Sequence, residues 1–382
     1  MGCYNKDIEI EHKGALTMSK IIPARLADQP KDYERLGLSE TILPWEDGLR
    51  THGKFGEYEW WYFDAKLEDG SSLVITFYTS PMTAMTNGFD PSAAFTLTRA
   101  DGSVLKDEVR LDMEQCSFAK DRCHVKIGNC IFEGDLTDYH IHFETDRIHA
   151  EITLHGNTAA WRPKSGHILF GGKKFFAWLP AVPEGSVTAT ITTDGATVTQ
   201  KGTGYHDHNW GNAGMFWLMH HWYWGRAKIG DYQIISSYIT ARKKYGYEHF
   251  PIFLLAKDGT LLGDNPDYLT FSQTDAETDP VTGKYFHKNL VYDYNDGVQH
   301  YRITYRMEDY IEQLTANNVS TAGAGNIGLP LKLALKLAGL DPTYTRVLGT
   351  VTLERFEDDE IVEQIQAPGL WEQMYFGTNQ DV

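Results

Sequence analysis

One short segment of the chain gathers most of the residue types that carry out acid–base chemistry. It covers residues 204–212, with the sequence GYHDHNWGN, and the sequence HHWYWGR follows at residues 220–226. A carboxylate between two histidines supplies groups that exchange protons near neutral pH, and the neighbouring tryptophans supply apolar walls. If the protein performs chemistry, we expect it at this segment.

The backbone geometry of the central segment decides which of its side chains can act together. In an extended chain, alternate side chains point to opposite faces. The two expected groups are His206, His208 and Trp210 on one face, and Tyr205, Asp207 and Asn209 on the other.

Three interpretations of the motif follow. The one that we favour is a hydrogen-bonded acid–base network in which Asp207 and either His206 or His208 carry protons. A His-x-His pair completed by His220 or His221 is also a pattern that binds metal ions, although no thiolate lies near it in the sequence. A third interpretation is a buried polar network that joins two β units.

A second aromatic segment, EYEWWYFD at residues 57–64, is the expected partner of the first. On a strand it carries Glu59 among Trp and Phe side chains, where a carboxyl group loses the hydration of its anion and can keep a proton near neutral pH. Pairing of Glu59 with an arginine or with backbone amides is the alternative. The predicted catalytic residues are His206, Asp207, His208 and Glu59. The predicted substrate-binding residues are Tyr58, Trp60, Trp61, Tyr62, Tyr205, Asn209, Trp210, His220, Trp222, Trp224 and Tyr238.

Other chemistries find less support in the sequence. There is no GxSxG nucleophile motif. Residues 323–328, GAGNIG, match the GxGxxG expression of dinucleotide sites, but that motif is informative only between a buried strand and a helix of a βαβ unit. We therefore interpret it as a glycine-rich loop, and we expect no cofactor and no bound metal.

The elements that must position these residues are β-strands. Runs of β-branched and aromatic residues at 73–78, 94–98, 139–143, 147–154, 187–191, 232–239, 250–255 and 290–294 are separated by turn signals, among them Asp-Gly pairs at 69–70, 101–102, 258–259 and 296–297. Many short strands at even spacing predict an all-β sandwich or barrel. Residues 329–339 favour a short helix, since Pro330 suits its first turn and Gly339 its end.

Composition excludes several classes of protein. The formal net charge of −17 over 382 residues, without a basic cluster, argues against binding to nucleic acid or to anionic membranes. No apolar run is long enough to cross a bilayer, and the first residues lack a signal peptide, so we expect a cytoplasmic protein with reduced cysteines. We expect residues 1–17 to be an extension or the product of an upstream start.

Three segments together resemble a known group of proteins. They are residues 59–65 (EWWYFDA), 176–180 (FAWLP) and 204–211 (GYHDHNWG). They are similar to the AttH-like and hydroxyneurosporene synthase (carotenoid 1,2-hydratase) superfamily, whose architecture fungal decalin-forming Diels–Alderases share. The resemblance covers residues 45 to 376.

The resemblance implies two lipocalin-like β-barrels in tandem with a ligand pocket at or near their junction. The expected organisation is a lead-in at 1–44, a first barrel at 45–213 and a second barrel at 214–382. Members of the superfamily hydrate isoprenoid double bonds or fold polyenes without a redox cofactor, and His208 and Trp210 match a His-x-Trp pair implicated in the hydratases. The resulting hypothesis is a cofactor-independent hydratase, lyase, isomerase or cyclase that acts on an apolar, unsaturated small molecule. A pericyclase, a lipocalin-type carrier and a structural protein are the alternatives.

Overall fold

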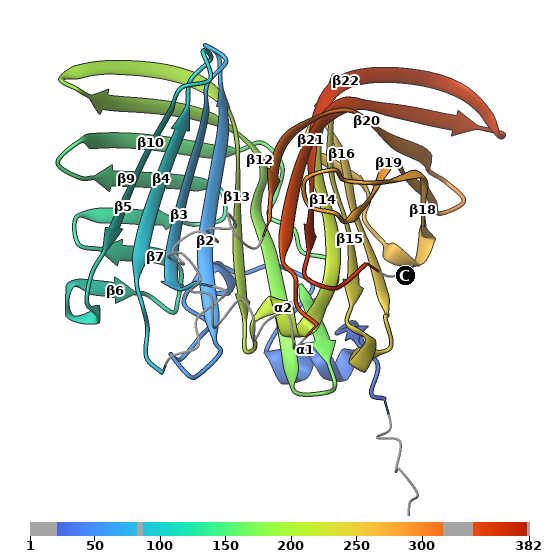
Figure 1. Cartoon of the computed structure of the whole chain (residues 1–382), viewed down its shortest axis with the longest axis horizontal. Helices are drawn as coiled ribbons and strands as arrows, with labels where there is room; N and C mark the ends of the chain where they lie inside the picture. Colours follow the sequence, from blue (N-terminus) through green and yellow to red (C-terminus); the bar gives the residue numbers. More distant parts are fainter. Residues whose placement is uncertain (1–20, 82–86, 316–338, 380–382) are drawn as a thin grey trace, which may run out of the picture.

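The strands of the protein form two antiparallel sheets that lie side by side (Figure 1). The computed structural model describes residues 21–81, 87–315 and 339–379. Within these ranges one sheet has 13 strands and the other has 9, and every paired neighbour is antiparallel. The prediction of an all-β antiparallel fold is therefore confirmed.

The first sheet is built from the N-terminal half of the chain. Its hydrogen-bonded order is β5-β4-β3-β2-β13-β12-β10-β9-β8-β7-β6, with β11 on β12 and β1 on β11. The strands are β1 (Arg25–Leu26), β2 (Tyr58–Leu67), β3 (Ser72–Ser80), β4 (Ser92–Thr98), β5 (Val104–Arg110), β6 (Cys116–Phe118), β7 (Cys123–Ile127), β8 (Cys130–Gly134), β9 (Asp138–Glu144), β10 (Ile148–Gly156), β11 (His167–Phe170), β12 (Lys174–Thr193) and β13 (Ala196–Gly211).

The second sheet follows directly in the chain and has the order β17-β16-β15-β14-β22-β21-β20-β19-β18. Its strands are β14 (Met219–Ile229), β15 (Tyr232–Ala241), β16 (His249–Lys257), β17 (Thr260–Gly263), β18 (Leu269–Thr278), β19 (Tyr285–Asn295), β20 (His300–Leu314), β21 (Thr343–Glu357) and β22 (Glu360–Tyr375). Because β13 ends at Gly211 and β14 begins at Met219, we propose residues 213 and 214 as the boundary between two domains.

Both sheets curl around a core of their own. In the first, Phe77 of β3 contacts Phe132 of β8 at a centroid distance of 5.6 Å, although several strands separate them in the sheet order. In the second, Tyr238 of β15 stacks on Phe271 of β18 at 3.9 Å. Such contacts require the two ends of a sheet to approach each other. Each sheet is thus a lipocalin-like half-barrel, and the described strands close neither of them by hydrogen bonds.

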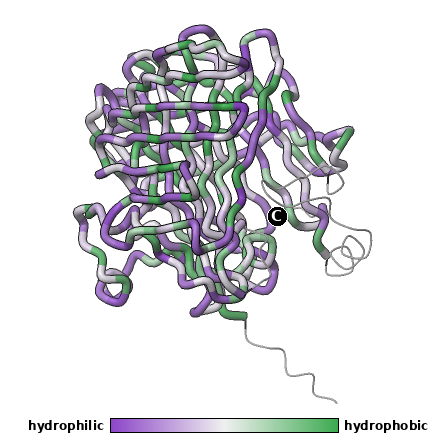
Figure 2. Tube along the Cα trace, turned by 90° about the vertical axis from the view of Figure 1, so that its left-hand side faces the viewer, coloured by the Kyte–Doolittle hydropathy of each residue, from purple (hydrophilic) through white to green (hydrophobic). Residues whose placement is uncertain are grey.

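The strand periodicity explains why the sheets curl. Along β9 and β10 every second residue is buried, and hydrophilic and hydrophobic residues alternate along the strands of the first sheet (Figure 2). The alternation leaves the histidines of β9 on the solvent side, with the side chain of His140 45% exposed. All four predicted Asp-Gly turns connect consecutive strands, and their glycines have positive φ values of 75° to 86°.

Short helices connect or cover the sheets. They are α1 (Pro30–Leu36), η1 (Pro44–Asp47), η2 (Met113–Gln115), α2 (Met215–Leu218), η3 (Lys243–Tyr245) and η4 (Pro266–Tyr268). None of the described helices is both long and apolar enough to span a membrane. The helix predicted for residues 329–339, the glycine-rich loop at 323–328 and the N-terminal extension at 1–17 lie wholly or almost wholly outside the described residues.

Three apolar clusters hold the molecule together. Each half-barrel contains one, and the third lies between the two sheets. The first sheet contributes Trp178 of β12 and Tyr205 of β13 to this third cluster, and the second contributes Ile235 of β15 and Met374 of β22. The outer face of β13 therefore packs against the second half-barrel while its inner face packs inside the first.

Candidate functional site

The two aromatic segments lie on adjacent strands. In the antiparallel register of β2 and β13, Trp61 lies opposite His208 and Tyr62 lies opposite Asp207. The predicted division of β13 into two faces is confirmed, because His206, His208 and Trp210 lie on the inner face. Tyr205 and Asp207 lie on the outer face. The three predicted proton carriers are therefore not one network: the histidines face the first core, and Asp207 faces the second sheet.

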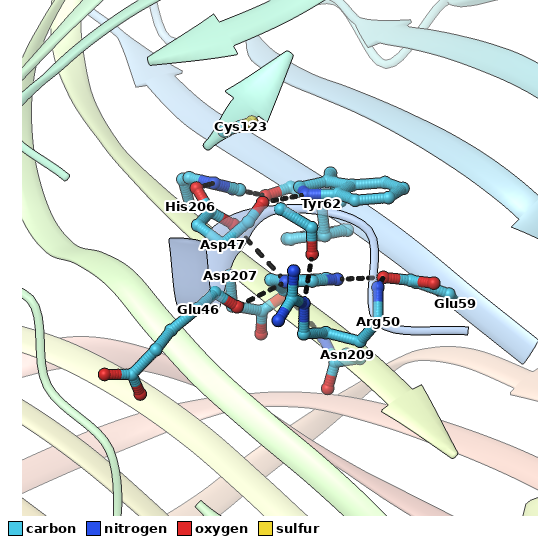
Figure 3. Close-up of polar contacts among 12 residues, drawn as sticks. Glu46, Asp47, Arg50, Glu59, Tyr62, Cys123, His206, Asp207 and Asn209 are labelled. Atoms are coloured by element: carbon cyan, nitrogen blue, oxygen red, sulfur yellow. Dashed lines mark hydrogen bonds and ion pairs between the residues drawn. The ribbon is translucent and has the colours of Figure 1, made fainter. Parts of the chain in front are cut away.

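On the inner face, His208 is held on both sides by acceptors. Its Nε2 atom lies 2.8 Å from Glu59 Oε1 and its Nδ1 atom lies 3.3 Å from the carbonyl of Glu46 (Figure 3). Trp61 stacks on the ring at a centroid distance of 4.5 Å. Oxygen atoms on both sides and the stacked indole therefore hold the His208 ring in one orientation.

His206 has the same arrangement with different partners. Its Nδ1 atom lies 2.8 Å from the carbonyl of Tyr62, and its Nε2 atom lies 3.2 Å from Asp47 Oδ2. The hydroxyl of Tyr139 donates to the same carboxylate oxygen at 2.6 Å. Burial by itself would raise the pKa of Asp47, but His206, followed by His208 and Tyr139, lowers it overall.

Glu59 does not lie alone in an apolar environment. It accepts hydrogen bonds from the backbone amides of Arg50 and Thr51 at 2.6 and 2.8 Å, besides the contact with His208. The alternative interpretation of Glu59, an anion that binds backbone amides, matches this geometry better than a proton donor does. Beside it, Arg162 Nε donates to Glu46 at 2.8 Å, with both side chains almost fully buried.

The inner network therefore fastens the lead-in to the first half-barrel. Glu46 and Asp47 belong to η1, and each contacts a basic side chain on a distant part of the chain, Arg162 for Glu46 and His206 for Asp47. Buried charges are tolerated when they are paired and hydrogen-bonded. Sequence reasoning missed both carboxylates, because nothing in a proline-containing lead-in indicates that it enters a barrel.

On the outer face, Asp207 is the centre of a second network. Its Oδ2 atom accepts from Trp178 Nε1 at 2.8 Å and from the hydroxyl of Tyr205 at 2.7 Å, and its Oδ1 atom accepts from Asn209 Nδ2 at 2.7 Å. Burial raises the pKa of this carboxyl to about 6, although the bonds from Tyr205 and Trp178 act to lower it. Asp207 thus exchanges its proton close to neutral pH.

Charged and phenolic groups from both sheets surround the outer face. Arg226 of β14 forms an ion pair with Asp64 of β2, and its guanidinium lies 4.6 Å from the centre of the Tyr205 ring. The Tyr344 hydroxyl donates to Glu372 at 2.6 Å, and burial raises the pKa of Glu372. The contacts of Arg226 link β14 of the second sheet to β2 and β13 of the first, and the Tyr344–Glu372 bond joins β21 to β22 within the second sheet.

Four aromatic residues border the polar side chains around Asp207. Trp60, Tyr62, Trp222 and Trp224 are half-buried and pack against the cluster between the sheets. Burial raises the pKa of Tyr62 well above its ordinary value although its side chain keeps some accessible surface. Tyr58 is fully buried in the same cluster and stacks on Trp60 at 5.6 Å.

Four predicted binding residues lie away from this face. Trp61 and Trp210 lie on the inner face beside His208, and Tyr238 and His220 lie in the second sheet. Tyr238 packs on the core inside the second half-barrel, against Phe271. His220 lies at the start of β14, with its Nδ1 atom 2.9 Å from Nδ1 of His221, and burial lowers its pKa to about 4. The alternative interpretation of a metal site at His206, His208 and His220 or His221 does not match this geometry, because His208 contacts Glu59 and His220 contacts Thr378.

The junction of the two sheets also carries a cavity of about 910 Å³. Its walls come from the lead-in, from the segment around Trp161 and from the segment around Asp264. None of the predicted site residues lines it. The predicted aromatic pocket therefore does not coincide with this cavity.

Comparison with known proteins places these features in a wider group. A family model described as Diels-Alderase-like matches residues 54–309, more than half of the chain. The AttH-like protein from Nitrosomonas europaea has a similar structure, with 17% identity, a TM-score of 0.56 and coverage of 89% of this chain and 98% of that chain. At this level of identity, the structural similarity shows the fold alone.

Two curated relatives match shorter parts of the sequence. A quinolone epoxide rearrangement protein of Emericella nidulans is 30% identical over 86 residues, which are 22% of this chain and 23% of the relative. A hydroxyneurosporene dehydrogenase of Chlorobaculum tepidum is 24% identical over 229 residues, which are 45% of this chain and 54% of the relative. The chain thus covers less than two thirds of either relative.

Proposed function

The chain belongs to the Diels-Alderase-like family, and on that premise we propose that it is an enzyme that transfers a proton to an apolar, unsaturated small molecule held between the two sheets. The proposal keeps Asp207 as the proton carrier. His206, His208 and Glu59 lie on the inner face of β2 and β13, opposite to Asp207. The proposal therefore gives them the role of holding η1 against the first half-barrel.

The observation that carries the proposal is the raised pKa of the buried Asp207 carboxyl group, which three hydrogen-bond donors hold in place. A carboxyl group with a pKa of about 6 is partly protonated at neutral pH, so that it can both donate and take back a proton. Three fixed donors hold it in one orientation. A preorganised acid needs little rearrangement when the reaction begins.

The proposed reaction is the hydration of an alkene or its cyclisation. The Asp207 proton is transferred to one alkene carbon, and the electron pair of the double bond forms the new C–H bond. The adjacent carbon becomes a cation, which water or a second double bond of the substrate captures. The capturing group or a neighbouring carbon then releases a proton to the Asp207 carboxylate, so that the enzyme is restored.

The aromatic residues at the edge of the interface suit such an intermediate. The faces of Trp60, Trp222 and Trp224 carry π density that attracts a cation, and an apolar enclosure keeps bulk water from it. The phenols of Tyr62 and Tyr344 lie in the same desolvated region. These five residues are the substrate contacts that we propose.

One residue favours a second candidate, a pericyclase. The side chain of Arg346 of β21 lies near Tyr62, Tyr344 and Glu372, and it forms no hydrogen bond or ion pair with any residue in the described ranges. A guanidinium without such a partner can donate hydrogen bonds to a substrate carbonyl, which would activate a dienophile without a proton transfer. This candidate uses the same region but makes no use of Asp207 as an acid.

An isotope experiment separates these candidates. The full-length protein is incubated in D₂O with extracts of its own host that are rich in unsaturated metabolites, and the products are analysed by mass spectrometry. A proton transfer from Asp207 places deuterium from solvent on carbon. A pericyclase forms product without this label, and a carrier returns the ligand unchanged.

The variant Asp207→Asn removes the acid and keeps the size of the side chain. We expect it to lose at least about 100-fold in the rate of deuterium incorporation while it still retains ligand in native mass spectrometry. The matched control is Asp138→Asn, at a carboxylate that is 70% exposed on the first half-barrel. Full activity of Asp207→Asn would refute the acid–base proposal.

A further inference from the structure

The fold brings a cysteine next to the histidine motif, although none is near it in the sequence. Cys123 of β7, Asp47 of η1 and His206 of β13 each present one ligand atom, and these atoms all lie within 4.8 Å of one another. All three residues are buried, and Figure 3 shows Cys123 on the same side of the network as His206 and Asp47. We propose that the three residues bind one divalent ion of the zinc class inside the first half-barrel.

The orientation of His206 suits this role. Its Nδ1 atom lies 2.8 Å from the carbonyl of Tyr62, so the proton on that nitrogen is used and Nε2 is directed toward Asp47. Metal-binding histidines commonly donate one N–H to a carbonyl in this way, which fixes the ring and leaves the other nitrogen for the ion.

Asp47 provides an independent indication. Its Oδ2 atom accepts from Tyr139 and His206, whereas Oδ1 is buried and accepts no hydrogen bond from any residue in the described part of the chain, with His208 Nδ1 in ion-pair range at 3.5 Å. A buried carboxylate oxygen without a donor costs free energy that a bound cation would recover. The side chain of Asp47 is only 1% exposed, so bulk solvent does not supply the donor.

The donor set favours zinc over magnesium or calcium. A thiolate, an imidazole and a carboxylate are ligands of zinc, whereas magnesium and calcium prefer oxygen atoms alone. Bonds of about 2.0–2.3 Å place the ligands of a tetrahedral zinc ion roughly 3.5 Å apart. The three atoms would therefore approach one another by at most about 1.3 Å, and a water molecule would supply the fourth ligand.

Binding has a defined proton balance. As the metal–sulfur bond forms, the Cys123 thiol releases its proton to the solvent, and the proton on His206 Nε2 leaves as the metal–nitrogen bond forms. A surface cavity of about 630 Å³ borders Cys123 and Tyr139 and provides a route for the ion. Because Asp207 lies on the other face of β13, the ion would stabilise the attachment of η1 rather than take part in the proposed reaction.

Cobalt is the probe that tests the site. The full-length protein is produced in medium that contains Co²⁺ in place of Zn²⁺, and its absorption spectrum and metal content are measured. We expect about one equivalent of cobalt and a thiolate-to-cobalt charge-transfer band in the near ultraviolet, which Zn²⁺ removes. Wild-type protein that holds no cobalt, or that holds it without this band, would overturn the proposal.

Variants distinguish metal binding at this site from metal binding elsewhere on the protein. Cys123→Ser should abolish the band and weaken Zn²⁺ binding at least about tenfold, whereas Cys130→Ser, at a buried cysteine of the same core, should keep both. The group His142, His149 and Glu151 on the outer face can also bind metal, but it contains no thiol. The stoichiometry is therefore measured in a His149→Ala background. A band that persists in Cys123→Ser would refute the assignment, and the wild-type spectrum decides the question even if that variant does not fold.

Discussion

Asp207 combines two properties that seldom occur together in one side chain. It accepts three hydrogen bonds, which favour the anion, and yet burial raises its pKa to about 6. Desolvation therefore outweighs the hydrogen bonds. The functional consequence is a carboxyl group that is held in one place and still binds a proton near neutral pH.

A first prediction concerns the stability that Asp207 contributes at different pH values. Its pKa is higher in the folded state than its ordinary value of 3.8, so its contribution is fully present below pH 4 and is lost as the pH rises through about 6. Asn at this position does not titrate. Relative to wild type, Asp207→Asn should therefore gain about 2.4 kcal/mol in the free energy of unfolding between pH 4 and pH 7.5.

Urea denaturation at several pH values measures this difference. The control Asp138→Asn, which removes an exposed ion pair with His155, should differ from wild type by less than about 1 kcal/mol at each pH. A constant difference between wild type and Asp207→Asn across this range would mean that the carboxyl does not titrate there.

At the scale of elements, β13 is the strand on which the architecture depends. Its inner face carries His206 and His208 to the carboxylates around η1, and its outer face carries Tyr205 and Asp207 to the second sheet. Because side chains alternate along a strand, residues 205–208 divide between the two faces. One strand thus positions both a structural network and the proposed site.

A second prediction concerns the attachment of η1. Glu59→Ala removes the acceptor of His208 Nε2 and of the backbone amides of Arg50 and Thr51, all of which lose their partner in a buried region. Removal of one partner from a buried ion pair costs about 3–5 kcal/mol. Chemical denaturation should show a loss of this size.

The matched control for Glu59 is an exposed carboxylate that also contacts a histidine. Glu133→Ala removes the partner of His124, and both side chains are more than one third exposed. Such a change should cost less than about 1 kcal/mol. Equal effects of the two substitutions would contradict the role assigned to the inner network.

At the scale of the whole molecule, the two half-barrels share an apolar cluster. Its members include residues of β2, β11, β12 and β13 on one side and of β14, β15, β16 and β22 on the other. The ion pair between Asp64 and Arg226 crosses the same interface. Because this burial is lost when either half opens, the two halves should unfold together.

A third prediction tests this coupling. Ile235 is fully buried in the cluster between the sheets, and Ile235→Asp places an unpaired carboxyl group there. We expect one thermal transition for the wild-type protein in calorimetry, and two transitions at lower temperature for the variant. The control Ile361→Asp, at a side chain that is 50% exposed, should keep the single transition.

Much of the fold was predictable from the sequence alone because its signals are local. Alternation of apolar and polar residues determined the strands, and Asp-Gly pairs determined four of the turns. The same alternation assigns His206 and His208 to the face of β13 opposite Asp207. Recognition of the family likewise depended on short segments such as residues 204–211.

Tertiary structure decided which groups meet, because charge pairing and burial depend on contacts between distant parts of the chain. His206 and Asp47 are 159 positions apart, and Trp178 reaches Asp207 from a neighbouring strand. No periodic signal marks either contact. The role of Glu59 changed for the same reason: the lead-in supplies amide donors that its own strand does not. Local sequence thus set the direction of each side chain, and long-range packing set its partner and its proton affinity.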